Sequence, residues 1–253
     1  MNKGLFGQPR SNDRHGLNVG DIVVSTDPTS FGIDQFVPIN VAVKEAYHKD
    51  VLADFGLSYT EDFHTDSVDT TPTGLGNDVA FSPDGQFMAV AHAASPFVTI
   101  YSISGTTFTK LTNPASLPTG DGNDVAFSPN GQFMAVAHNT SPYITIYSIS
   151  GTTFTKLANP ASLPAFTGNG VAFSPDGQFM AVAHNNSPFI TIYSISGTTF
   201  TKLTNPASLP PSIGRSVAFS PDGQFMAVAH NNSPFITIYS ISGTTFTKLT
   251  NPA

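Results

Sequence analysis

Residues 79–92 read Val-Ala-Phe-Ser-Pro-Asp-Gly-Gln-Phe-Met-Ala-Val-Ala-His, and this stretch returns three times with one substitution, Asn130 for the aspartate. Each copy continues through Thr-Ile-Tyr-Ser-Ile into Ser-Gly-Thr-Thr-Phe-Thr-Lys-Leu, and the period is 46 residues. A repeat of this length indicates a structural unit that buries its faces only by stacking on its own copies. The units are 76–121, 122–167, 168–213 and 214–253.

Each unit predicts four short strands, which in the first unit span 78–82, 86–92, 97–103 and 107–111. Ser82-Pro83-Asp84-Gly85 has the proline and glycine positions of a type I turn. The first three strands are apolar on both faces, and the fourth is more polar. This decrease in hydrophobicity from the inner strands to the fourth strand predicts a sheet that is covered on both faces and exposed to solvent at its outer edge.

A lone sheet of this kind cannot bury both faces, whereas sheets stacked face to face around an axis can. The sequence therefore predicts a mainly β fold: four 46-residue, four-stranded β-propeller blades with a small N-terminal strand–strand–helix module. A solenoid would need a shorter period, and a sandwich gives no reason for near-identical units.

The stretch 79–92, followed by Phe-Val-Thr-Ile-Tyr-Ser at 97–102, resembles the WD-repeat and related surface-layer-type propellers. The chain has no tryptophan, and Tyr101-Ser102 stands where those proteins usually have Trp-Asp. Their histidine–aspartate network is therefore not carried over. The resemblance covers 76–253 and implies a fold, not a function.

Residues 1–75 contain no copy of the repeat. We expect an extended docking arm over 1–18, a small α+β module over 19–57, and a connector with an outer strand over 58–75. The module's helix would present one apolar stripe at a spacing of four residues. The side chains expected to dock on neighbouring subunits are Leu5, Phe6, Tyr47 and Phe55.

The order of motifs in this module resembles the collar-type modules of bacteriophage tail and fibre proteins. The motifs are Gly-Asp-Ile-Val at 20–23, Phe-Val-Pro-Ile-Asn at 36–40, and a helix that holds Tyr47 and closes at Gly56. Val41 and His48 depart from that pattern, which usually has glycine and proline there.

This resemblance implies a virion structural protein: a tail fibre, an appendage or a capsid-decorating component. Its location would be the virion, after synthesis in the host cytoplasm. Its partners would be other virion subunits, further copies of itself, and a glycan or protein of the host surface. The alternative is a free carbohydrate- or protein-binding β-propeller without a virion role.

Composition narrows the partners further. Only 11% of the residues are charged, and the net charge is −7, so no basic surface for nucleic acid is expected. No apolar run reaches the roughly 18 residues of a membrane-spanning helix. Cysteine is absent, which excludes disulfides and thiolate metal sites. Residues 1–75 carry a net charge of −6 and residues 76–253 a net charge of −1.

Two sets of equivalent residues invite a metal interpretation. One histidine per unit would lie at one height around a closed ring, yet a hydrogen bond to a local turn explains its repetition as well. One aspartate per turn could bind calcium, but a single carboxylate is far short of the six to eight oxygen ligands required. We expect no metal and no cofactor. The residues are His92, His138, His184 and His230, and Asp84, Asn130, Asp176 and Asp222.

Two further sets invite a binding interpretation. A lysine on each outermost strand could bind a partner, but such lysines also prevent sheets from aggregating edge to edge. An aromatic residue after each Ser-Pro could stack on sugar rings or belong to the core. The lysines are Lys110, Lys156, Lys202 and Lys248; the candidate binding face is Phe97, Tyr143, Phe189, Phe235, Asn139, Asn185, Asn186, Asn231 and Asn232.

No catalytic motif is recognisable, and variation among the units falls largely in their connections. Identical blades also argue against a catalytic site that needs different residues from different blades. We therefore expect no enzyme. Four blades in an open set would expose two apolar faces. The four blades could close on themselves, the N-terminal module could cap the gap, or further chains could complete the ring or bury the ends. We expect assembly into a larger particle to contribute to closure.

Overall fold

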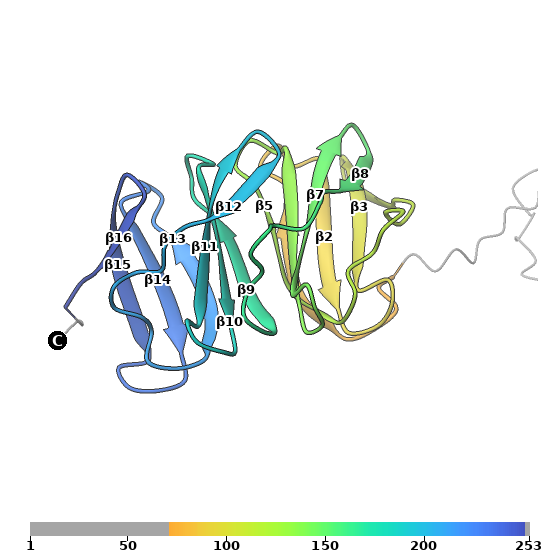
Figure 1. The fold of residues 1–253 in the computed structure, drawn as a ribbon. Coiled ribbons are helices and arrows are strands. Elements are labelled where there is room, and N and C mark those ends of the chain that lie inside the picture. Colours follow the sequence, from red (N-terminus) through yellow and green to blue (C-terminus); the bar gives the residue numbers. More distant parts are fainter. Residues whose placement is uncertain (1–70, 251–253) are drawn as a thin grey trace, which may run out of the picture. The chain divides into compact units, whose positions relative to one another are not determined.

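The computed structural model describes residues 71–250, where sixteen strands form four separate four-stranded sheets (Figure 1). Every sheet is antiparallel, and its strands lie in chain order from the first to the fourth. The predicted four-bladed, mainly β architecture is confirmed. The arm at 1–18, the module at 19–57 and residues 58–70 of the connector lie outside the described residues, as do Leu5, Phe6, Tyr47 and Phe55.

Blade 1 consists of β1 (Gly76–Phe81), β2 (Phe87–His92), β3 (Val98–Ser104) and β4 (Thr107–Lys110). The first strand begins two residues before the predicted start, because Gly76 pairs with His92 on the far side of a bulge. The other blades repeat these bounds: β5 (Gly122–Phe127), β6 (Phe133–His138), β7 (Ile144–Ser150) and β8 (Thr153–Lys156); β9 (Gly168–Phe173), β10 (Phe179–His184), β11 (Ile190–Ser196) and β12 (Thr199–Lys202); β13 (Gly214–Phe219), β14 (Phe225–His230), β15 (Ile236–Ser242) and β16 (Thr245–Lys248).

The turn between the first two strands forms as predicted. The Gly85 amide donates to the Ser82 carbonyl at 2.9 Å, which closes a β-turn. Asp84 Oδ1 accepts hydrogen bonds from the Ser82 hydroxyl and from the Gln86 amide. The aspartate thus serves the turn, and Asn130 does the same in blade 2 through its own Oδ1.

Consecutive blades pack through two different faces. The forward face of a blade contacts the next blade, and in blade 1 it comprises Phe87, Ala89, Ala91, Val98 and Ile100. The backward face receives that contact, and in blade 2 it comprises Val125, Met134, Val136, Tyr147 and Phe154. Equivalent clusters join blade 2 to blade 3 and blade 3 to blade 4. Apolar burial of this kind is the main force that holds sheet on sheet.

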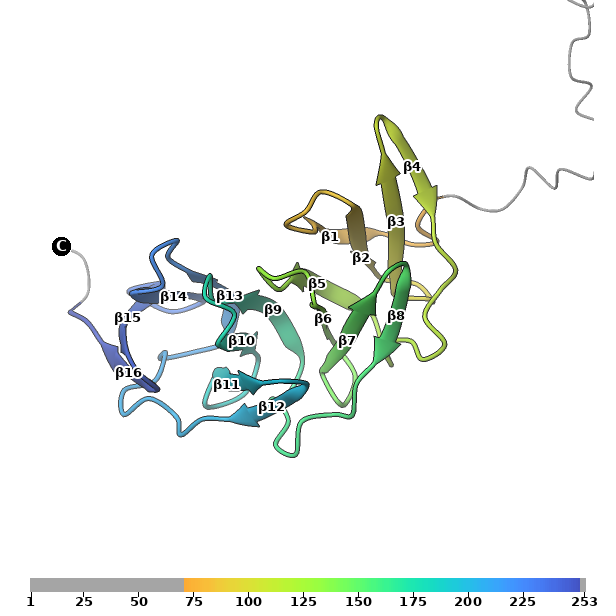
Figure 2. The ribbon, with the colours of Figure 1, turned by 90° about the horizontal axis from the view of Figure 1, so that it is seen from above.

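The innermost strands β1, β5, β9 and β13 lie on the inner side of an arc, and β4, β8, β12 and β16 lie on its outer side (Figure 2). Glycine permits a close approach between blades, because a Cβ on Gly122 would collide with the Phe97 carbonyl of blade 1. Gly76 has no such neighbour, since only Val90 Cγ1 lies nearby, at 3.8 Å from its Cβ position.

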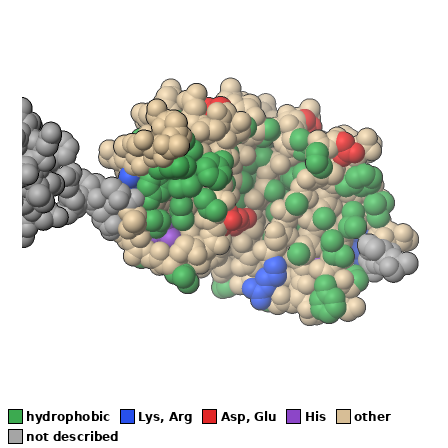
Figure 3. All heavy atoms as spheres, turned by 180° about the vertical axis from the view of Figure 1, so that it is seen from behind, with side chains coloured by type: hydrophobic (Ala, Val, Ile, Leu, Met, Phe, Trp, Pro, Cys, Tyr) green, Lys and Arg blue, Asp and Glu red, His purple; other side chains and the backbone are tan. Residues whose placement is uncertain are grey.

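The two end faces of the arc are exposed. On the backward face of blade 1, Val79 is 53% exposed and Phe81 57%, whereas the equivalent Val125 is 3% exposed. On the forward face of blade 4, Phe225 is 39% exposed, against 7% for Phe87. Figure 3 shows apolar side chains gathered over blade 1. Among residues 71–250, no hydrophobic cluster joins blade 4 to blade 1.

Candidate functional site

Blades 3 and 4 depart from blades 1 and 2 at two adjacent positions of the innermost strand. Blades 1 and 2 have Asn-Asp there, at 77–78 and 123–124, whereas blade 3 has Asn-Gly at 169–170 and blade 4 has Arg-Ser at 215–216. Sequence reasoning placed the variation in the connections and missed this pair of positions. The signal was present as a departure from the repeat within a strand that is otherwise conserved.

The first of these positions is a β-bulge in every blade. A bulge inserts an unpaired residue and re-aims its side chain. Asn77 Nδ2 donates to the Gly122 carbonyl of the next blade at 2.7 Å, and Asn123 and Asn169 make the same bond. Arg215 occupies the fourth bulge, where its Nε donates to Asn231 Oδ1 at 2.7 Å.

The second position holds a carboxyl pair. Asp78 Oδ2 accepts from the Val125 amide at 3.0 Å, and Asp124 Oδ2 accepts from the Val171 amide at 2.6 Å. The two carboxyl groups also hydrogen-bond to each other. Burial, and then the hydrogen bond with Asp78, hold the pKa of Asp124 far above its ordinary value. Asp124 therefore keeps its proton to a higher pH than an ordinary aspartate does.

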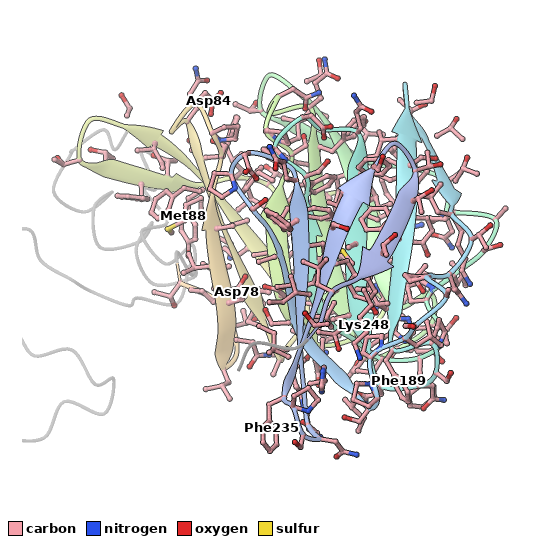
Figure 4. All side chains as sticks on the ribbon, turned by 90° about the vertical axis from the view of Figure 1, so that its left-hand side faces the viewer. Asp78, Asp84, Met88, Phe189, Phe235 and Lys248 are labelled. Carbon is pink, nitrogen blue, oxygen red and sulfur yellow. The ribbon has the colours of Figure 1, made fainter. Side chains whose placement is uncertain are left out.

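Packing confines the pair to blades 1 and 2. A Cβ on Gly170 would lie 2.9 Å from Ser216 Cα, so blade 3 has no room for an aspartate at this position. The same Cβ position lies 3.4 Å from Asp124 Oδ2. Figure 4 shows Asp78 on the half of its blade nearer to the end that carries Phe189 and Phe235, with Asp84 at the opposite end.

The four equivalent histidines are buried inside their own blades. His138 Nε2 lies 2.9 Å from Thr145 Oγ1 on the neighbouring strand, and the other three make the same contact with their threonines. Burial lowers the pKa of His138 and of His184 to about 4. Within residues 71–250, no three histidine or carboxylate side chains are grouped so that they could hold a metal ion.

The predicted aromatic set lies at the head of the third strands. Phe97, Tyr143 and Phe189 are half-buried, whereas Phe235 is 62% exposed. Tyr143 packs on Phe166 with ring centroids 5.5 Å apart. Three of the four are therefore partly covered by their surroundings, and whether the set binds a ligand stays a prediction.

Several of the predicted asparagines lie beside the bulges. Asn185 Oδ1 accepts from Asn169 Nδ2, Asn231 Oδ1 accepts from Arg215, and Asn139 Nδ2 donates to Asp121 Oδ2. Asn186 and Asn232 are exposed.

The lysines lie on the outermost strands, as predicted. In the part of the chain that the structure describes, no helix could cross a membrane.

Four sheets stacked through their faces around one axis define a β-propeller. The family described as "Lactonase, 7-bladed beta-propeller" matches residues 53–161 and 79–251. The chain belongs to this family. The propeller part of the sequence resemblance is thus confirmed.

Solved structures agree on the fold. A "putative 6-phosphogluconolactonase" from Bacteroides uniformis superimposes with a TM-score of 0.57 at 18% identity, over 68% of this chain and 53% of that one. Another, from Bacteroides fragilis, gives a TM-score of 0.57 at 15% identity, over 68% and 52%. Hydrazine synthase from Kuenenia stuttgartiensis gives 0.56 at 17%, over 75% and 51%. The chain spans about half the length of these structures, and no curated protein matches it.

These comparisons contradict the expectation that the chain is not an enzyme, since the family is one of hydrolases. The argument from identical blades overlooked the innermost strands, where the blades differ. Neither the family description nor the structures named above refer to a virion, and the virion role, its partners and its location stay predictions. The alternative of a free carbohydrate- or protein-binding propeller stays a prediction as well.

Proposed function

We propose that this chain forms part of a hydrolase that opens cyclic esters, with the Asp78–Asp124 pair as its acid and base. The observation that carries the proposal is the hydrogen bond between these two carboxyl groups together with the raised pKa of Asp124. Two carboxyl groups that share one proton offer a general acid and a general base at the same pH. Membership of the lactonase family supports a lactone as substrate.

In the proposed reaction a water molecule attacks the lactone carbonyl while the ionised carboxylate accepts the proton that the water loses. The ring C–O bond breaks, and the protonated carboxyl group supplies a proton to the departing ring oxygen. One lactone and one water give one hydroxy acid, and the pair returns to its singly protonated state. Positioned groups of this kind typically contribute 10²- to 10⁴-fold each.

Arg215 supports a negatively charged substrate. Its side chain is exposed and belongs to an innermost strand, and a guanidinium group binds phosphate or carboxylate through paired hydrogen bonds. Two of the similar structures bear the name "putative 6-phosphogluconolactonase". A sugar lactone phosphorylated at its terminal carbon is therefore the substrate we propose first.

The test compares the wild-type chain with the variants Asp78→Asn and Asp124→Asn in the hydrolysis of 6-phosphogluconolactone. The rate of hydrolysis is measured from the release of acid. Asparagine keeps an oxygen for the valine amide and removes the titratable group, so folding should persist. We expect kcat to fall at least about 100-fold in each variant. Activity should also fall as the pH rises through the raised pKa of Asp124, because the shared proton is then lost.

Asp176→Asn is the matched control. It removes a carboxyl group from a turn where blade 2 already has Asn130, so kcat should stay within twofold. Unchanged hydrolysis in both pair variants would overturn the assignment of the site. Absence of lactone hydrolysis by the wild-type chain would overturn the proposed activity.

A further inference from the structure

The loop between β6 and β7 differs from its counterparts in the other blades. It reads Asn-Thr-Ser-Pro-Tyr at 139–143, whereas blades 3 and 4 have Asn-Asn-Ser-Pro-Phe and blade 1 has Ala-Ala-Ser-Pro-Phe. The connections on its two sides, Thr-Gly-Asp at 119–121 and Ala-Phe-Thr at 165–167, differ from each other and from Pro-Ser-Ile at 211–213. Side chains that the fold requires recur in every near-identical unit. Departures that gather in one place therefore indicate a task other than folding.

Hydrogen bonds join this loop to the connection that precedes it. The Asn139 amide donates to the Asp121 carbonyl at 3.2 Å, and Asn139 Nδ2 donates to Asp121 Oδ2 at 2.9 Å. The Thr119 hydroxyl donates to the Ser141 carbonyl at 2.8 Å. A carboxylate has about four lone-pair positions. Asp121 therefore keeps acceptor capacity beyond the bond from Asn139.

The connection that follows the loop supplies an aromatic pair. Tyr143 packs on Phe166 with ring centroids 5.5 Å apart and ring planes 38° apart. The Thr167 hydroxyl donates to the Asn139 carbonyl at 3.4 Å, which holds this connection against the loop. Phe166 is 44% exposed, and Asn139 is exposed as well. A carboxylate, an amide and an open aromatic surface thus lie around one loop.

We propose that Asp121, Asn139, Tyr143 and Phe166 form a binding site for a pyranose ring of a neutral saccharide, which we call the loop site. The C–H groups on one face of the pyranose pack on the Phe166 ring. Hydroxyl groups of the same ring bond to Asp121 and Asn139. An apolar contact surface with a few polar groups that orient the ligand is the usual composition of a small-molecule site.

The hydrogen-bonding groups favour a hydroxylated ligand over an ion. Asp121 offers acceptors only, whereas Asn139 Nδ2 has a second N–H beyond the one that serves Asp121. A sugar hydroxyl both donates and accepts, so neighbouring hydroxyl groups can satisfy both residues. An ammonium ion only donates, and a phosphate or carboxylate ion would be repelled by Asp121.

The loop site is separate from the Asp78–Asp124 pair. Its residues belong to the loop and the connections and not to the innermost strands. Tyr143 is the equivalent of Phe189 and Phe235, which Figure 4 shows at one end of the molecule. Saccharide binding there requires no lactone hydrolysis, so the inference does not rest on the proposed function.

The test is a calorimetric titration of the full chain with three neutral saccharides: cellohexaose, maltohexaose and mannohexaose. We expect at least one of them to bind. Phe166→Ala should raise the dissociation constant of that saccharide about tenfold, because the stacking surface is lost. Asp121→Asn keeps an oxygen for Asn139 and should raise the constant about threefold, because a bond to a charged acceptor becomes a neutral one.

Two variants serve as controls. Phe108→Ala removes a ring that is 46% exposed on the outermost strand β4, and the dissociation constant should stay within twofold. Tyr143→Phe restores the residue of the other three blades and keeps the aromatic ring, so its effect should be smaller than that of Phe166→Ala. Urea denaturation of each variant separates lost binding from lost stability.

Three outcomes would overturn the proposal. The first is a wild-type chain that binds none of the three saccharides at millimolar concentration. The second is binding that Phe166→Ala leaves unchanged, which would place the saccharide elsewhere. The third is binding of tetramethylammonium ion in place of the saccharides, which would make the loop site a cation site. A chain that lacks lactonase activity would leave all of these readouts intact.

Discussion

In the turn between the first two strands of each blade, the serine should matter most for stability. Ser174 is buried. Its hydroxyl accepts a hydrogen bond from the Phe179 amide at 2.8 Å and donates one to Asp176 Oδ1. A buried amide that loses its acceptor cannot turn to water. The aspartate, in contrast, is exposed and only orders the turn.

We expect Ser174→Ala to lower the free energy of unfolding by about 1–3 kcal/mol, the cost of one buried unsatisfied amide. Asp176→Asn should change it by less than about 0.5 kcal/mol, as surface substitutions usually do. Urea denaturation of both variants beside the wild type measures the difference. Equal losses in the two variants would contradict this division of roles.

The buried histidines make stability depend on acid. Burial lowers the pKa of His138 and His184 from 6.5 to about 4. Between these two pKa values the histidines bind protons in the unfolded chain but not in the folded chain. The free energy of unfolding therefore falls as the pH is lowered from about 6.5 to 4. Each histidine contributes at most about 3 kcal/mol across this range.

We expect His138→Gln to make this dependence shallower in urea titrations between pH 4 and 7. Asp124 acts in the opposite direction, because its raised pKa stabilises the folded chain at low pH and this contribution is lost as the pH rises. Asp124→Asn should therefore steepen the loss of stability on acidification. A dependence that neither substitution changes would contradict both assignments.

At the scale of the blades, glycines at the starts of the innermost strands set the distance between sheets. A Cβ on Gly168 would collide with the Tyr143 carbonyl and lie 3.1 Å from Ala137 Cβ. Backbone cannot yield as the tip of a side chain can. The sheets would have to separate, and the cluster of buried residues between them would loosen.

We expect Gly168→Ala to lower the free energy of unfolding by about 1–3 kcal/mol, the usual cost of overpacking. Gly76→Ala is the matched control, since it faces no preceding blade within the described chain. It should change stability by less than about 0.5 kcal/mol. A similar loss in both variants would show that the effect is not steric.

At the scale of the whole molecule, the described residues leave the two end faces of the arc uncovered. Phe81 on blade 1 is 57% exposed and Phe225 on blade 4 is 39% exposed, whereas the equivalent residues at the internal junctions are more deeply buried.

The sequence by itself determined the blade. A 46-residue period, strands apolar on both faces and a Ser-Pro-Asp-Gly turn suffice for four-stranded sheets that stack, because these features act over neighbouring residues and repeat. The strand boundaries came out within two residues, and the turn role of Asp84 was correct.

Only the tertiary structure decided which residues form the candidate site. Asp78 and Asp124 are 46 positions apart and look like two copies of one repeat residue. They become a carboxyl pair because bulged innermost strands from neighbouring blades meet near the axis, where burial raises the pKa of Asp124. That proximity depends on the distance and the direction from each sheet to the next, and so do the uncovered faces at the two ends of the arc. No pattern within one repeat specifies these two quantities.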